Sequence, residues 1–139
     1  MSSTSFEDIR QDVLSALATA HASSYVTTPL ELPNMLLVDL EIQTAPWVRA
    51  ELAIDKNKQF CMGATHTRVE GLLYIVTFMK AGSGTKWSTM YSDFLRTTFS
   101  LKTLNGVDFK EVIPLPGVGY PAWHAMRNRL PFSTEIYNI

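Results

Sequence analysis

The side chains that could catalyse reactions or bind metals form no recognisable constellation in this chain of 139 residues. The three histidines, His21, His66 and His124, lie far apart and show no spacing typical of metal ligands. The single cysteine, Cys61, cannot form an internal disulfide and fits a reducing compartment. We interpret it as a small, semi-buried residue. The sequence therefore predicts no catalytic residues, no cofactor-binding residues and no metal ligands.

A glycine-rich turn, Gly82-Ser-Gly84-Thr-Lys86, follows a predicted strand and precedes a predicted helix, as phosphate-binding loops do. It lacks the spacing of such loops, and two glycines are common in ordinary turns. The carboxylates are dispersed, and no pattern requires two of them to share a site. One alternative stays open: a small cytoplasmic enzyme or ligand-binding domain using this turn and a cleft beside His66 or His124.

Composition limits the class of protein. Hydrophobic residues make up 46% of the chain and charged residues 18%, which indicates one globular domain over residues 1–139. The net charge of -1 and the absence of a long basic run argue against a protein that depends on contacts with duplex phosphates. The longest apolar run, Leu72 to Met79, is too short to span a bilayer, and we expect no membrane partner. No secretory signal is apparent, so we expect a soluble protein of cytoplasmic origin.

One strand, turn and helix organise the predicted fold. Residues 69–79 are almost continuously apolar on both faces, which is typical of a strand in the middle of a sheet. Residues 86–99 repeat apolar side chains at helical spacing, so we expect this helix to pack on the strand. The predicted core residues are Leu72, Tyr74, Val76, Phe78, Trp87, Met90, Tyr91, Phe94, Leu95 and Phe99.

Other elements complete the prediction. After a flexible tail (residues 1–5), a helix is expected over residues 6–20 with Ser5 or Thr4 as its cap. Residues 47–54 alternate as a half-buried strand, and Asn105-Gly106 predicts a two-residue hairpin turn.

A loop is expected over residues 114–121, and a last strand over 123–137 is an edge strand or bulged because it contains Pro131. Residues 21–45 give mixed signals, with the hint of a strand over 36–42. The fold class is α/β (α+β): a mixed, largely antiparallel sheet of four to five strands with two main helices, one packed on the sheet.

The connection over residues 55–65 is longer than a hairpin usually requires, so we predict an extended hairpin loop that contacts a partner. It carries two lysines followed by apolar residues, a pattern that suits an arm ordered by its partner. Tryptophan is frequent at protein interfaces. The candidate interface residues are Lys56, Lys58, Gln59, Phe60, Met62, Trp47 and Trp123.

Several short phrases in this order resemble a family of small proteins of long-tailed bacteriophages. The phrases are Pro46-Trp47-Val48-Arg49, Glu70-Gly71-Leu72, Ala81-Gly-Ser-Gly84, Asn105-Gly106-Val107 and Leu130-Pro131-Phe-Ser-Thr-Glu-Ile136-Tyr137. In organisation the chain is similar to tail terminator, or tail completion, proteins over roughly residues 6–137. Residues 28–42 fit the pattern least well.

The resemblance implies a structural protein, not an enzyme. It implies a homo-hexameric ring that caps the tail tube protein, stops its polymerisation and docks onto the head–tail connector or stopper protein. DNA would pass through the lumen without specific binding. The protein would be found in the tail or neck of the virion and, during assembly, in the host cytoplasm. A head completion or connector-stopper protein is the alternative within the same class.

Overall fold

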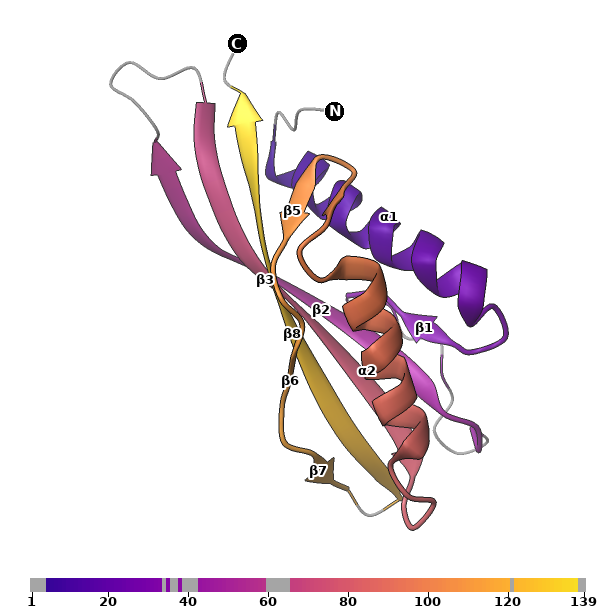
Figure 1. Cartoon of the computed structure of the whole chain (residues 1–139). Coiled ribbons are helices and arrows are strands. Elements are labelled where there is room, and N and C mark those ends of the chain that lie inside the picture. The colour runs from indigo at the N-terminus through magenta and orange to yellow at the C-terminus, as the bar shows by residue number, and fades with distance from the viewer. Residues whose placement is uncertain are drawn as a thin grey trace.

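The structure is a computed structural model that describes residues 5–33, 35, 38, 43–59, 66–120 and 122–137, with the backbone alone at 55–59, 66–67 and 136–137. It is a mixed α+β fold with two helices and a curled, mostly antiparallel sheet of eight strands (Figure 1). The helices are α1 (Phe6–Ser24) and α2 (Lys86–Phe99), and the three long strands are β2 (Trp47–Gln59), β3 (His66–Lys80) and β8 (Trp123–Tyr137). The short strands are β1 (Leu30–Glu31), β4 (Thr103–Leu104), β5 (Val107–Phe109), β6 (Ile113–Pro114) and β7 (Val118–Gly119).

The sheet has more strands than the four to five predicted, because short segments pair along the edges of the long ones. Its order is β1-β2-β3-β8-β5-β4, and β6 and β7 also pair with β8. The predicted loop over residues 114–121 therefore contains β7 and the end of β6. The possible strand over residues 36–42 lies almost wholly outside the described residues.

β3 occupies the predicted central position. It pairs antiparallel with β2 on one side and, over its whole length, with β8 on the other. Among the described strands, β1 and β2 are the one parallel pair.

Pro131 lies inside β8, which is neither an edge strand nor bulged against β3. The Pro131 carbonyl accepts a hydrogen bond from Lys110 N on the side away from β3. Backbone N–H and C=O groups of one strand residue point to the same side, so the missing N–H of Pro131 also falls there, between β5 and β6. The Lys110 carbonyl accepts from Leu101 N instead. The proline is tolerated because the neighbouring strand is interrupted at this point.

The first helix begins where the sequence predicts and ends four residues later. The Ser5 side chain accepts a hydrogen bond from Asp8 N at 3.1 Å, which is the expected N-cap contact. The helix continues to Ser24, and its last turn holds the buried His21. α2 begins and ends at the predicted residues.

The predicted hairpin is confirmed. Asn105 and Gly106 have φ of 53° and 77°, the positive values that a two-residue turn of type I′ requires. The turn joins β4 to β5, which in turn pairs with β8. Asn105 also donates its side-chain amide to the Asp12 carbonyl, which ties the turn to α1.

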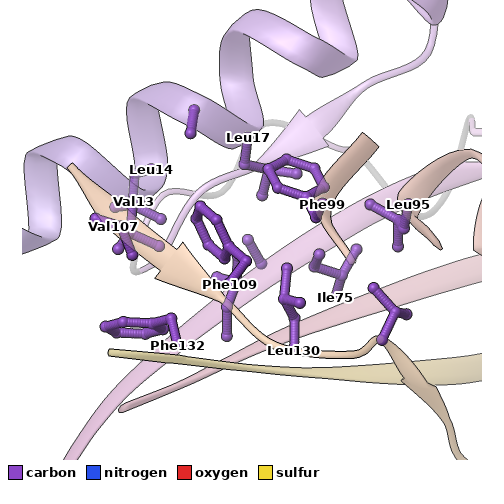
Figure 2. Packing of buried hydrophobic residues seen from close by; sticks show 14 of the residues in the cluster. Val13, Leu14, Leu17, Ile75, Leu95, Phe99, Val107, Phe109, Leu130 and Phe132 are labelled. Carbon is purple, nitrogen blue, oxygen red and sulfur yellow. The ribbon is translucent and has the colours of Figure 1, made fainter. Parts of the chain in front are cut away.

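Both helices cover the same face of the sheet, whereas we predicted one (Figure 1). This covered face presents alternate residues of β3, including the fully buried Val69, Leu73 and Ile75. Figure 2 shows Val13, Leu14 and Leu17 of α1 packed over Phe109, Phe132 and Leu130 of the sheet, with Ile75, Leu95 and Phe99 beside them.

The predicted core was wrong for the strand and partly right for the helix. Leu72, Tyr74, Val76 and Phe78 point to the opposite face, where they are only half-buried. Tyr91, Leu95 and Phe99 are fully buried as predicted, Trp87 and Phe94 pack half-buried against the core, and Met90 is 53% exposed. Met90 is exposed because it lies on the outer side of α2, although it shares the spacing of the apolar residues.

Gly71 permits the closest packing on the covered face. A Cβ atom on Gly71 would lie 2.4 Å from the ring of Phe132 and 2.7 Å from the Ala53 carbonyl oxygen. Phe132 is the β8 residue that pairs with Gly71, so its ring fills the space that a side chain would need.

The predicted loop over residues 55–65 was wrong in its first half. β2 continues to Gln59, and Lys56 to Gln59 pair with Glu70 to Thr67 of β3. The low strand propensity of Asp, Lys and Asn made this segment resemble a loop, but the neighbouring strand supplies its backbone hydrogen bonds. We call the outer parts of β2, β3 and β8 (residues 55–59, 66–70 and 133–137) the arm. In Figure 1 the outer ends of β2 and β3 stand clear of the helices.

Candidate functional site

The face of the sheet opposite the helices is the most distinctive surface of the described chain. We call it the open face and define it by the residues of three strands that lie on this side of the sheet, of which Trp47 and Ala125 are buried: Trp47, Arg49, Glu51 and Ala53 of β2, Leu72, Tyr74, Val76 and Phe78 of β3, and Ala125, Arg127, Arg129 and Pro131 of β8. The pairing places these residues in rows across the strands, such as Arg49–Val76–Arg127 and Glu51–Tyr74–Arg129. The open face therefore has an apolar central strand with charged residues on both sides.

One end of the open face is closed by stacked aromatic rings. Trp47 lies parallel to Phe78 with ring centroids 4.0 Å apart, and Trp123 meets Trp47 edge-on at 6.2 Å. Trp47 is 1% exposed and Trp123 7% exposed. The two tryptophans predicted as interface residues are therefore buried within the chain itself, where they stack on the sheet.

Arg49 covers this aromatic group. Its guanidinium lies 5.2 Å from the Trp47 ring centre and 5.5 Å from that of Phe78, within the range of cation–π attraction. Arg49 also forms an ion pair at 2.9 Å with Glu31, which is 1% exposed. Glu31 accepts a second hydrogen bond from Val38 N. Arg49 is thus held by its contacts inside the chain.

Two other arginines of the open face are not held in this way. The Arg127 guanidinium lies 6.0 Å from the Tyr74 ring centre, and the Arg129 Nε atom is buried with no hydrogen-bond partner among the described residues. Neither arginine forms an ion pair with a carboxylate in the part of the chain that the structure describes. Glu51, which is exposed, likewise forms no ion pair with a lysine, arginine or histidine of the described residues. Glu51 and Arg129 are separated by the width of β3, which is about 10 Å across two strand spacings.

The predicted interface residues of the arm lie beyond the core. Lys56, Lys58 and Gln59 are on the outer part of β2. Phe60 and Met62 lie outside the described residues, as does Cys61. The prediction that these residues contact a partner remains a prediction.

The glycine-rich turn lies between two shallow hollows at the other end of the sheet. One, of about 310 Å³, is lined by residues that include Gly82, Gly84, Thr85 and His124. The other, of about 370 Å³, has Lys80 and Gly84 in common with the first and is bordered by Trp87 and Met90. Among the described residues, no carboxylate lines either hollow.

The three histidines do not come together. His66 pairs with Tyr137 at the arm, whereas His124 pairs with Met79 at the opposite end of β3. Within the described ranges, no three His, Cys, Asp or Glu residues are grouped so that they could hold a metal ion. No helix among the described residues is long and apolar enough to cross a membrane.

His21 of α1 is a structural residue that contacts α2. Its Nε2–H donates to the Thr28 carbonyl at 2.8 Å, so in the neutral ring Nδ1 accepts from the Tyr91 hydroxyl at 2.7 Å. Burial lowers the pKa of His21, and burial likewise raises the pKa of Tyr91 above its ordinary value. The pair joins the end of α1 to α2, and Tyr25 packs on both rings.

The comparisons with known proteins show the fold alone. One solved structure superposes on 96% of this chain and 97% of its own with a TM-score of 0.73 at 14% sequence identity, and the name of that protein states no function. No protein-family model and no curated protein sequence matches the chain.

Sequence reasoning missed the arginines of the open face. The signal was present: Arg127 and Arg129 alternate in a predicted strand, on the face opposite Met126 and Leu130. Their significance depends on the pairing of β8 with β3, which places them beside Tyr74 and Val76. That pairing joins residues about fifty positions apart and cannot be read from local pattern.

Proposed function

We propose that this chain is a structural protein of a bacteriophage virion, a tail terminator that caps the tail tube as a ring and joins the tail to the head connector. The sequence resemblance suggests the family, and the arm is the observation that carries the proposal. β2 and β3 pair out to Gln59 and Thr67, beyond the part of the sheet that the helices cover. A projecting strand pair offers a contact that does not disturb the core.

The arm would reach the tube or the adjacent subunit. Lys56 and Lys58 on β2 would meet acidic groups there or line the lumen. Arg68 of β3 pairs with Lys58 in the ladder and lies 3.5 Å from Glu70, which partly offsets its charge. Phe60 and Met62, at the tip of the connection in the sequence, would add apolar contact.

The ring itself would be a homo-hexamer closed by one repeated, heterologous contact. Such a ring would stop polymerisation of the tube because its outer surface differs from the surface that the next layer of tube subunits binds. The net charge of -1 suits a lumen through which DNA passes without specific binding.

Removing the arm tests the proposal. Asn57 and Val69 form a ladder pair, so replacing residues 58–68 by an Asn-Gly turn shortens the hairpin while retaining the buried Val69. We expect the melting temperature to change by only a few degrees, because no core residue of the described part of the chain is lost. We expect phage tails assembled with this variant to be overlong or headless in electron micrographs.

A matched control uses the other end of the molecule. Gly119→Ala lies in an open surface strand, where an added Cβ meets nothing within 4 Å, and should leave tail length normal. Tails of normal length and full infectivity with the shortened arm would overturn the proposed role of the arm.

The alternative within the same class is a head completion or connector-stopper protein. Labelling would locate such a protein on the head side of the joint between head and tail.

An enzyme or ligand-binding domain is the candidate of another class, and the hollow beside His124 is the observation that favours it. Replacing His66, His124 and Cys61 together with Ala tests this alternative. The structural role predicts that virion assembly continues. Loss of infectivity with normal folding and normal ring formation would support the enzyme.

A further inference from the structure

The open face carries unpaired charges of both signs in one row. Glu51, Tyr74 and Arg129 lie opposite one another on β2, β3 and β8. Glu51 is exposed, and neither it nor Arg129 has an oppositely charged partner in the described part of the chain. Their Cα atoms are about 10 Å apart across β3, and no ion pair joins the two side chains in the described part of the chain. Both side chains are therefore available to oppositely charged groups of another molecule.

A second copy of the same face supplies both partners. Two sheets that pack face to face align their strands within about 30°, and a two-fold axis along β3 produces this arrangement. The axis places β2 of one copy opposite β8 of the other, and each row of residues faces the same row of the other copy. Glu51 of one copy then faces Arg129 of the other, twice in each dimer. We propose that the free protein forms a two-fold dimer through its open face, with reciprocal Glu51–Arg129 ion pairs.

The remaining rows are compatible with this contact. Leu72, Tyr74 and Val76 each meet their own equivalents, so their half-exposed side chains bury one another. Arg127 faces the Arg49–Glu31 ion pair of the other copy, whose net charge is zero. Outside the central strands, Ile113 is 37% exposed and Val118 44% exposed, and both pair with β8 residues of this face.

The size of the surface predicts a weak dimer. The surface spans five strand positions, namely β1, β2, β3, β8 and the edge formed by β6 and β7. At about 4.8 Å per strand and six residue steps of about 3.4 Å, it covers about 500 Å² per copy. Stable interfaces bury about 800 Å² per partner, so we expect dissociation in the micromolar range or above. This inference goes beyond the proposed ring, which is closed by heterologous contacts.

Charge reversal tests the pairing of Glu51 with Arg129, and sedimentation equilibrium shows whether association stops at the dimer, as a two-fold contact requires. Glu51→Arg and Arg129→Glu should each weaken self-association at least about tenfold in sedimentation equilibrium. Mixed in equal amounts, the two variants should form a heterodimer. In that heterodimer the introduced arginine of one variant faces the introduced glutamate of the other, and the unchanged Arg129 and Glu51 face each other as in the wild-type protein. The double variant should also dimerise as the wild-type protein does.

Controls separate folding from association. Arg129→Gln, which removes the charge without reversing it, is the second variant should Arg129→Glu unfold, and it should also weaken the dimer. Arg96→Glu, on the exposed side of α2, should leave association unchanged. Urea denaturation of each variant shows whether it folds.

Several results would overturn the inference. These are a wild-type protein that stays monomeric to about 1 mM, single reversals without effect, or reversals that weaken association but do not restore it in the mixture. The last result would show that Glu51 and Arg129 do not pair with each other, and species larger than a dimer would indicate a heterologous contact. Failure of the protein to cap tail tubes would contradict the proposed function and leave the dimer unaffected.

Discussion

The two faces of the sheet are built from alternate residues of the same strands, yet they have different roles. On the covered face, Leu73 and Ile75 of β3 are fully buried beneath α1 and α2. On the open face their neighbours Leu72, Tyr74 and Val76 are only half-buried, between charged residues of β2 and β8.

The apolar character of a central strand therefore does not decide which face the helices cover. The flanking strands decide it, because Arg49, Glu51, Arg127 and Arg129 can lie only toward solvent or a polar partner.

Truncating adjacent leucines should give the largest contrast between the faces. Leu73→Ala leaves a cavity in the core and should lower the free energy of unfolding by about 2–5 kcal/mol. Leu72→Ala removes a half-exposed side chain and should cost about 1 kcal/mol or less. Urea denaturation measures both. Equal losses would show that the open face is as well covered as the other.

Adding one methyl group should reveal the tight packing of the covered face. Gly71→Ala forces the ring of Phe132 or the strand carrying Ala53 to move, and should cost about 1–3 kcal/mol. Gly119→Ala is the control, with open space around the new Cβ and an expected change within about 0.5 kcal/mol. A Gly71→Ala protein as stable as the parent would contradict the close contact with Phe132.

Acid should weaken the covered side through His21. Burial lowers its pKa in the folded protein, so the unfolded chain binds the proton more readily. The stability due to neutral His21 is fully present above the unfolded pKa of about 6.5 and is lost as pH falls toward the folded pKa. One such group changes the free energy of unfolding by at most about 1.4 kcal/mol per pH unit. His21→Gln should flatten the profile of melting temperature between about pH 7.5 and 5, and an unchanged slope would assign the acid sensitivity to other groups.

The smallest effect on folding is expected on the open face. Val76→Thr keeps the shape of the side chain and places its hydroxyl at a half-exposed position, so the free energy of unfolding should fall by less than about 1 kcal/mol. The same hydroxyl would be buried in the dimer, and association should weaken at the same time. A large loss of stability with no change in association would reverse the assignment of the two faces.

Local pattern predicted the elements that local physics determines. The N-cap at Ser5, the bounds of α2 and the positive φ values of Asn105 and Gly106 depend on neighbouring residues. The last two were predicted, and Ser5 was one of the two predicted cap residues. The faces of β3, the extension of β2 to Gln59 and the place of Pro131 depend on which strand lies beside them. Those partners are distant in the sequence, so local pattern could not supply them.

The dimer through the open face is tested most directly by a dilution series of the methyl-labelled protein followed by NMR. We expect the methyl signals of Leu72, Val76, Ile113 and Val118 to shift with concentration, because these side chains enter the contact. The signals of Leu73, Ile75 and Leu95, on the covered side, should stay in place. Shifts confined to residues of α1 or α2, or no shifts up to about 1 mM, would contradict the account.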